Sequence, residues 1–146
     1  MNTYVYTDGS CDGNPGRGGY AAIIRTGWCC KEIVGSVPHS TNNRMELQAV
    51  IKGLAEVKPC SNVTVFTDSA YVEQAVNQGR LDAWRSNGWR RIRTGEPVQN
   101  KADWLVLLDT IHGRKLNVRF QKLSAHKGHY FNERADFLAR QAAKSA

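Results

Sequence analysis

The hydrophobic positions along the chain change their spacing several times, and each spacing predicts one kind of element. Short apolar runs bounded by Gly, Asn, Asp or Pro are typical of strands. Such runs predict five strands, at residues 4–8, 18–25, 31–37, 62–67 and 116–120. Only a short turn with Thr26-Gly27 separates the second run from the third, so the first three strands are expected to form an antiparallel meander.

Helical spacing follows the third strand. In residues 44–58, apolar residues recur at i, i+3, i+4 and i+7, which predicts an amphipathic helix that ends before Pro59. Further helices are predicted at 70–77, 101–112 and 132–143, with residues 80–99 irregular. Asn100 is expected to cap the helix at 101–112. The inward-facing residues of the last two helices are predicted to be Leu105, Leu108, Ala135, Leu138, Ala139 and Ala142.

The order of elements predicts the fold class. Three strands, a helix, a strand, helices, a strand and a final helix give a mixed sheet flanked by helices, in an α/β layered domain. A chain of 146 residues is long enough to bury a sizeable core, and it has no internal repeat or linker. We therefore expect a single domain over residues 1–146.

Charge and composition narrow the class of partner. A net charge of +7 favours a polyanion such as nucleic acid. No run approaches the roughly 18 apolar residues that span a bilayer, and the N-terminus lacks the layout of a signal peptide, so a cytoplasmic location without membrane contact is expected. No apolar stripe remains for an interface, which favours a monomer. The four cysteines show no zinc-ligand spacing and are interpreted as free thiols.

Four acidic residues stand at places that suggest a shared site. Asp8 and Asp68 each end an apolar strand, Glu46 lies in the first turn of a predicted helix, and Asp136 lies in the last helix. Carboxylates are the ligands that Mg²⁺ prefers, and two such ions about 4 Å apart suit phosphodiester cleavage. Without metal the four charges would repel one another, so at least one pKa is expected to be raised.

Each acid also has an ordinary structural interpretation. Glu46 follows Asn43 at the spacing of a capping box, and Asp68 precedes a helix that it would cap. Asp8 would then serve the turn that follows it, and Asp136 would be a solvated helix residue. Spacing alone leaves both interpretations open.

Four motifs together go further than the acids alone. They are Tyr6-Thr7-Asp8-Gly9-Ser10-Cys11-x-Gly13-Asn14-Pro15-Gly16, Thr41-Asn42-Asn43-Arg44-Met45-Glu46-Leu47, Thr67-Asp68-Ser69 and His126-x-Gly128-His129-x-x-Asn132-Glu133-x-x-Asp136. In this order and over essentially the whole chain, they resemble type 1 ribonuclease H of the bacterial kind. The resemblance favours the shared acidic site over four separate structural roles.

The resemblance implies a ribonuclease H-like fold with a five-stranded mixed sheet, and endonucleolytic cleavage of the RNA strand in RNA–DNA hybrids. It implies that Asp8, Glu46, Asp68 and Asp136 hold two Mg²⁺ ions, for which Mn²⁺ substitutes, and that His126 assists proton transfer or product departure. The implied products carry 3′-hydroxyl and 5′-phosphate ends.

The resemblance also implies substrate contacts. Cys11 (through its backbone), Asn14, Asn42 and Asn43 would contact the minor groove of the hybrid, and Thr41 would seat a DNA phosphate. Arginines and tryptophans form a basic protrusion suited to phosphate contact and stacking. Its members are Trp84, Arg85, Trp89, Arg90, Arg91 and Arg93. Alternatively, this stretch is a solvated loop with its tryptophans folded onto the core. Ala70 departs from the family, because many relatives carry a substrate-contacting Gln there.

Two other functions fit part of the pattern. A fold relative that cuts DNA, such as an integrase or a junction resolvase, would share the acids but not need the Asn-rich groove contacts. A binding module without catalysis would share the basic surface, but would gain nothing from four acids beside phosphate.

Overall fold

The computed structural model describes residues 2–123 and 129–146. Its centre is a five-stranded sheet in the order β3-β2-β1-β4-β5. β1 pairs antiparallel with β2, and β2 with β3, whereas β4 runs parallel to both β1 and β5. The predicted mixed sheet with its antiparallel meander is therefore confirmed. The strands are β1 (Asn2–Gly13), β2 (Gly16–Thr26), β3 (Cys29–Ser40), β4 (Asn62–Thr67) and β5 (Asn117–Lys122).

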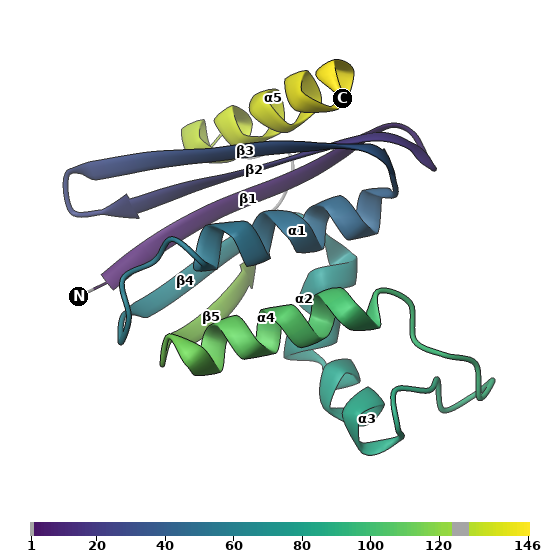
Figure 1. Ribbon diagram of the computed structural model, residues 1–146. Helices are drawn as coiled ribbons and strands as arrows, with labels where there is room; N and C mark the ends of the chain where they lie inside the picture. Colours follow the sequence, from purple (N-terminus) through teal and green to yellow (C-terminus); the bar gives the residue numbers. More distant parts are fainter. Residues whose placement is uncertain (1, 124–128) are drawn as a thin grey trace.

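Helices cover both faces of the sheet (Figure 1). The final helix α5 lies on one face, and the other helices lie on the opposite face. None of the helices in the described part of the chain is long and apolar enough to cross a membrane. The helices are α1 (Asn42–Leu54), α2 (Ala70–Asn77), α3 (Arg80–Ser86), α4 (Lys101–Gly113) and α5 (Tyr130–Ser145).

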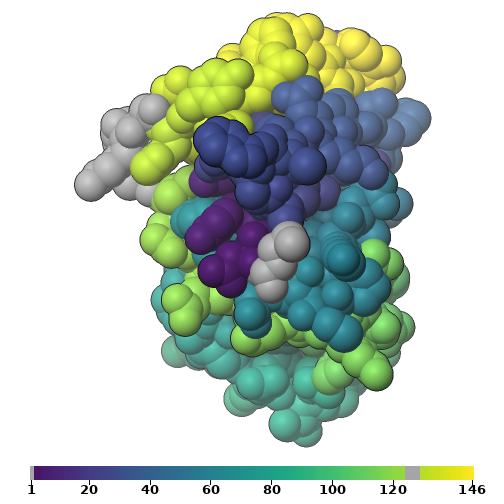
Figure 2. Space-filling view, turned by 90° about the vertical axis from the view of Figure 1, so that its left-hand side faces the viewer, coloured from purple at the N-terminus to yellow at the C-terminus, as the bar shows by residue number. Residues whose placement is uncertain are grey.

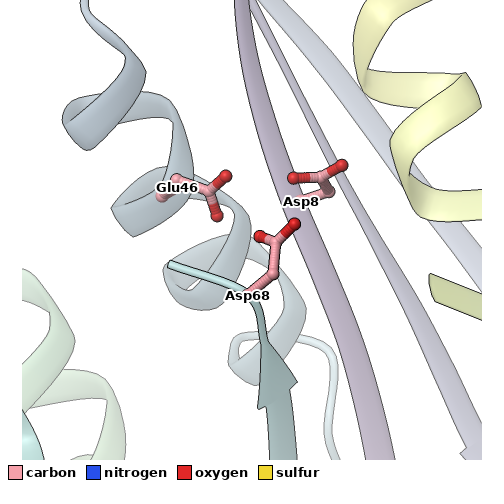
Figure 3. Close-up of side chains that lie close together, drawn as sticks. All are labelled: Asp8, Glu46 and Asp68. Atoms are coloured by element: carbon pink, nitrogen blue, oxygen red, sulfur yellow. The ribbon is translucent and has the colours of Figure 1, made fainter. Parts of the chain in front are cut away.

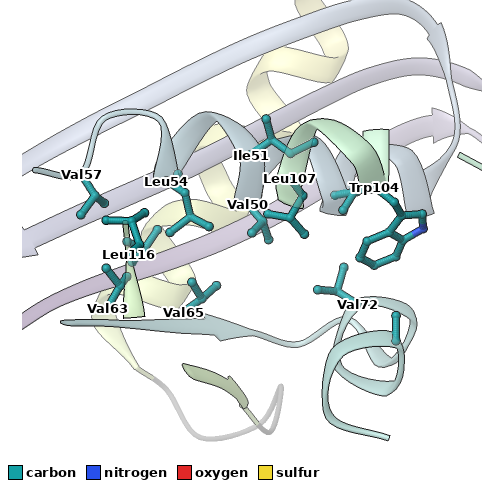
Figure 4. Close-up of a cluster of buried hydrophobic side chains, with 14 of the residues drawn as sticks. Val50, Ile51, Leu54, Val57, Val63, Val65, Val72, Trp104, Leu107 and Leu116 are labelled. Carbon is teal, nitrogen blue, oxygen red and sulfur yellow. The ribbon is translucent and has the colours of Figure 1, made fainter. Parts of the chain in front are cut away.

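The larger core lies between the sheet and helices α1, α2 and α4 (Figure 4). The apolar stripe of α1 that the sequence predicted is buried there, with Leu47, Val50 and Leu54 fully buried. Trp104 of α4 is also fully buried and donates its Nε1–H to the Tyr71 hydroxyl at 3.0 Å. Buried Trp side chains need such a partner for the indole N–H, and burial of this apolar area is the main stabilising contribution.

The contact between α5 and the sheet is made by small residues. Ala135 and Ala139 are fully buried against β2. A side chain at Gly19 would overlap the Ala139 carbonyl oxygen, so the helix backbone lies directly on the strand. The N-terminal end of α5 is held by Arg134, which donates to both carboxylate oxygens of Glu32 at 2.8 and 3.2 Å.

Several predicted boundaries were wrong. The third strand, predicted to end at residue 37 before Pro38, continues to Ser40, because β3 is an edge strand and an edge tolerates Pro. Residues 80–86, predicted to be irregular, form the short helix α3 that begins after Gly79 at φ +77°. Helix α1 starts two residues earlier than predicted and ends at Leu54 instead of Lys58.

The predicted inward face of α4 was shifted by one position. Trp104 and Leu107 are buried, Leu108 is half-buried, and Leu105 is 38% exposed. Asn100 precedes the helix but adopts a left-handed conformation, φ +61°, and makes no side-chain cap. Its amide instead donates to the Tyr71 hydroxyl at 3.2 Å.

Candidate active site

Asp8 lies where β1 passes beside helix α1. Val5 and Thr7 point into the core on one side of the strand, and Asp8 follows on the other, only 5% exposed. Its Oδ1 accepts a hydrogen bond from the Gly9 N–H at 2.9 Å. A Cβ at Gly9 would overlap the backbone nitrogen of Glu46, so only glycine allows the strand to approach the helix this closely.

Glu46 is held in the second turn of α1 and points toward the same place. The helix is capped by Thr41, whose Oγ1 accepts from the Arg44 N–H at 3.3 Å. The alternative that Asn43 and Glu46 form a capping box is therefore wrong. Glu46 is 8% exposed, and its Oε2 has no hydrogen-bond partner in the described part of the chain.

Asp68 follows β4 directly, in the short segment before α2. Ser69 caps α2 by accepting from the Val72 N–H at 3.2 Å, so the alternative that Asp68 is the cap is wrong as well. The Thr67 hydroxyl accepts from the Ser69 N–H at 3.0 Å and fixes the turn. Two neighbouring hydroxyl residues thus support the backbone and leave the Asp68 carboxylate to point at Asp8 and Glu46 (Figure 3).

The three carboxylates form one cluster. One oxygen from each of Asp8, Glu46 and Asp68 lies within 4.8 Å of the others (Figure 3). Asp136 of α5 borders this cluster and contributes to the raised pKa of Asp8. Its own carboxylate is 3.0 Å from Arg140, one turn along the helix, and is half-exposed. The structure thus brings together three of the four predicted acids and places the fourth beside them.

Burial and mutual repulsion dominate the electrostatics of the cluster. Burial, followed by the charge of Glu46, raises the pKa of Asp8 to about 11. Burial likewise raises the pKa of Glu46 to about 8, and burial is the main cause that raises the pKa of Asp68. Because several charged carboxylates at this distance are unfavourable without a compensating cation, the cluster suits hard divalent cations. The lone Oε2 of Glu46 fits the same ligand, since a buried acceptor needs a partner.

A second depression beside the cluster gathers several of the predicted substrate contacts. A cavity of about 500 Å³ is lined by polar side chains from the β1–β2 turn, the start of α1 and the segment before α4. The side chain of Asn14 accepts from the Asn42 N–H at 3.1 Å and so joins the turn to the helix start. The lining residues are Asn14, Pro15, Thr41, Asn43, Gln99 and Asn100. Gln99 and Asn100 also line this cavity but were not predicted to do so from the sequence, where Asn100 was interpreted as a helix cap.

Cys11 and Asn42, both predicted to contact the minor groove, are not among the residues that line this cavity. Cys11 is half-buried on β1, and its thiol faces the Gly16 carbonyl at 3.9 Å. Burial is the main cause that raises its pKa. His126 lies outside the described residues.

The basic protrusion, residues 84–93, combines two kinds of environment. Arg85, Arg90, Arg91 and Arg93 are exposed. In contrast, Trp84 and Trp89 are half-buried against the main core, and the Trp84 ring lies 5.9 Å from that of Trp104. The tryptophans therefore anchor this segment, as the alternative interpretation expected, while the arginines remain at the surface. Substrate contact by any of these residues stays a prediction.

Comparisons with known proteins agree with this geometry. The sequence model of the RNase H family matches residues 1–144. A protein of Chlorobium phaeobacteroides (strain BS1) named Ribonuclease H is 42% identical over 141 residues, which cover 97% of this chain and 94% of that protein. A Ribonuclease H of Nitratidesulfovibrio vulgaris (strain Hildenborough) is 45% identical over 139 residues, 95% of this chain and 87% of its own.

Solved structures show the same fold. LC9-RNase H1, a type 1 RNase H with the type 2 active-site motif, superposes with a TM-score of 0.80 at 29% identity, over 99% of this chain and 72% of its own. LC11-RNase H1, solved in complex with RNA/DNA hybrid, superposes with a TM-score of 0.74 at 23% identity, over 98% of this chain and 97% of its own. At that identity the second likeness supports the fold alone.

Proposed function

The chain belongs to the ribonuclease H family, and from this premise we propose that it is an endonuclease that hydrolyses the RNA strand of RNA–DNA hybrids. The observation that carries the proposal is the convergence of Asp8, Glu46 and Asp68 in a buried cluster, one oxygen of each within 4.8 Å. The relatives named Ribonuclease H, which are 42% and 45% identical over most of this chain, support the choice of substrate.

Divalent cations are the proposed cofactor. Asp8, Glu46 and Asp68 would hold them, with Asp136 completing the set from α5. Mg²⁺ fits these oxygen ligands, and Mn²⁺ is expected to substitute. When bound, two such ions supply an activated water and stabilise the leaving oxygen in phosphodiester hydrolysis. The raised pKa values of the buried carboxyls support this assignment, because a cation offsets the repulsion that keeps them protonated.

The remaining residues would bind and orient the substrate. Water is the proposed nucleophile: it attacks the phosphorus, the P–O3′ bond breaks, and the leaving O3′ takes up a proton. The products would therefore carry 3′-hydroxyl and 5′-phosphate ends, and the RNA 2′-OH would serve recognition. Asn14, Asn42 and Asn43 would read the minor groove together with the backbone at Cys11, and Thr41 would seat a DNA phosphate at the neighbouring cavity. His126 is proposed to move a proton at the leaving side.

The arginines of the basic protrusion are proposed to contact phosphates. Their exposed side chains need no rearrangement of the core to reach a polyanion. Trp84 and Trp89 would contribute by holding this segment in place, and any direct stacking on the substrate would involve their exposed edges.

A panel of labelled substrates tests the proposal. RNA–DNA hybrid, duplex DNA, duplex RNA and single-stranded RNA are each incubated with Mg²⁺, with Mn²⁺ and with EDTA. We expect cleavage of RNA in the hybrid only, loss of cleavage in EDTA, and 5′-phosphate ends on the products. Cleavage of duplex DNA would favour an integrase-like or resolvase-like activity instead. Binding of hybrid without cleavage in either metal would favour a binding module.

Domain organisation, oligomeric state and location also stay predictions. A single domain over residues 1–146 should unfold in one cooperative transition, and a monomer should elute from a size-exclusion column near 16.3 kDa. Fractionation of cells tests the cytoplasmic location.

A further inference from the structure

Helix α5 covers only part of its face of the sheet. It packs mainly on β1, β2 and β3, which leaves the same face of β4 and β5, and the beginning of β1, without a helix above it (Figure 1). On a strand, alternate side chains point to the same face. The side chains of this open area therefore come from alternate positions of β1, β4 and β5.

The strand register aligns these side chains in rows. Tyr4 lies opposite Arg25 on β2 and opposite Thr64 on β4, and Thr64 lies opposite Arg119 on β5. An aromatic ring and a hydroxyl group thus stand between two guanidinium groups, in a row about 14 Å long at normal strand spacing. Tyr4 is 40% exposed, and its ring stacks at 6.2 Å from that of Phe66.

A row of amides lies next to this one. Asn2, Asn62 and Asn117 are aligned across β1, β4 and β5, and all three are exposed. The Asn117 amide donates to Asn62 Oδ1 at 3.0 Å, so the two side chains lie edge to edge. The row offers both hydrogen-bond donors and acceptors to a ligand on the sheet.

With the exception of Arg25, whose guanidinium lies over the Phe131 ring, the residues of both rows line a groove of about 830 Å³ that also reaches the end of α2. Among the described residues that line it, none is acidic, and Arg119 supplies positive charge. Figure 2 shows the beginning of β1, in purple, at the surface between the dark blue hairpin of β2 and β3 and the teal and green segments. The groove therefore suits an anionic ligand with polar edges.

We propose that this groove binds single-stranded RNA. An exposed aromatic ring on a sheet offers a stacking surface for an unpaired base, and flanking arginines attract the phosphates. The amides and the Thr64 hydroxyl can pair with base edges and with the 2′-OH that distinguishes RNA from DNA. A duplex hides the faces of its bases, so the groove is distinct from the site that takes the hybrid.

The position of the groove fits the RNA strand that is being cleaved. Tyr4, Tyr6 and Asp8 alternate on the same side of β1, so the groove begins about 13 Å from the Asp8 carboxylate. Between them, the Tyr6 and Phe66 rings stack at 4.8 Å and continue the aromatic surface. Resting on the proposed function, this geometry predicts that an unpaired extension of the RNA strand leaves the active site along the groove.

Binding of RNA without divalent metal tests the groove directly. A fluorescein-labelled single-stranded RNA of about ten nucleotides is titrated with wild-type protein in EDTA, and its anisotropy is measured. Arg119→Glu should weaken binding about tenfold, because one phosphate contact becomes a repulsion. Lys52→Glu makes the same charge change on the exposed side of α1 and should alter binding less than about twofold. Equal losses in the two variants would overturn the proposal.

Tyr4 tests the stacking part independently. Tyr4→Ala should weaken binding about fivefold or more, whereas Tyr4→Phe keeps the ring and should bind like wild type. If single-stranded DNA of the same sequence binds as tightly as RNA, the assignment to RNA is wrong.

Cleavage of a blunt-ended hybrid separates this proposal from the proposed function. Arg119→Glu and Lys52→Glu should both cleave it at the wild-type rate, since a blunt substrate has no unpaired strand for the groove. If the wild type cleaves the blunt hybrid while both charge variants bind single-stranded RNA alike, the groove proposal alone fails.

Discussion

The carboxylate cluster and the basic protrusion are built in opposite ways. In the cluster, Asp8 and Glu46 are buried, Asp68 is half-buried, and Gly9 packs directly against the backbone of Glu46. The protrusion exposes its arginines and fixes only its tryptophans to the core. Chemistry at a phosphate needs ligands held to within fractions of an ångström, whereas long-range attraction of a polyanion needs only charge at roughly the right place.

Asp68→Asn should produce the largest effect, because it removes a proposed metal ligand from the carboxylate cluster. Loss of an outer-shell partner of a metal costs about 10–100-fold, so loss of a direct ligand should lower the cleavage rate by about 10³-fold or more. Binding of hybrid, measured by anisotropy, should stay within a few fold of wild type. Asp109→Asn makes the same chemical change on the exposed side of α4 and should leave the rate unchanged. A retained rate in Asp68→Asn would contradict the assignment of the cluster.

Gly9→Ala tests how rigid the cluster is. The added methyl group would overlap the Glu46 backbone nitrogen, so β1 and α1 must separate. We expect a loss of about 1–3 kcal/mol in the free energy of unfolding and a clear fall in cleavage rate. Urea unfolding and the hybrid assay measure both. Gly113→Ala is the matched control, since a Cβ there meets nothing within 4 Å; equal effects of the two changes would show that the contact is not tight.

The raised pKa values predict that stability of the metal-free protein falls with rising pH. The pKa of Asp8 is about 11 in the folded state, against about 4 in an unfolded chain. Folding therefore favours the protonated carboxyl, and this contribution is complete below about pH 4 and is lost as the pH rises through the folded value. Replacing the carboxyl by an amide removes the titration.

Thermal unfolding in EDTA from pH 5 to 9 measures this effect. Asp8→Asn should be more stable than wild type by about 1–3 kcal/mol at pH 8, and the difference should shrink toward pH 5. Added Mg²⁺ should stabilise the wild type more than the variant. If the difference in stability between Asp8→Asn and wild type does not change with pH, burial does not raise the pKa of the Asp8 carboxyl.

The double variant Arg91→Ala/Arg93→Ala should give the smallest effect and one confined to binding. We expect KM for hybrid to rise about three- to tenfold with kcat unchanged, and the dependence of binding on salt to weaken by about two phosphate contacts. Unfolding should be unaffected, because both side chains are exposed. Lys52→Ala serves as the control for loss of charge. A fall in kcat with constant KM would place these arginines in the chemistry instead.

The sequence predicted the fold well where burial sets the pattern. Leu47, Val50 and Leu54 form a stripe that only a helix can bury on one side. The antiparallel pairing of the first three strands follows from the short turn at Thr26-Gly27. The prediction was wrong where a single residue determines which face of a helix is buried. Trp104 determines which face of α4 is buried, but the spacing of Leu105 and Leu108 predicted a face one position further along. Helix α3 was missed because Leu81 is its only buried residue.

The site was predicted from sequence motifs more than from the packing and hydrogen bonds that bring its residues together. The acids that follow apolar runs, Asp8 inside β1 and Asp68 directly after β4, are visible in the sequence. Their convergence with Glu46 depends on how closely α1 approaches Gly9. The roles of Thr41 and Ser69 as helix caps, which leave Glu46 and Asp68 available, also require the structure. Trp84 illustrates the reverse problem, since its neighbours in sequence suggest a surface role and its neighbours in space include Trp104.

The direct backbone contact between Gly19 and α5 limits which substitutions this protein tolerates. The distance between α5 and the sheet is short because Gly19 has no side chain there. If a side chain were added, no neighbouring residue could move to keep that distance. A larger residue at Gly19, Ala135 or Ala139 would push the helix away from the sheet and carry Asp136 away from Asp8. The position of Asp136 beside Asp8 therefore depends partly on residues that have small side chains or none.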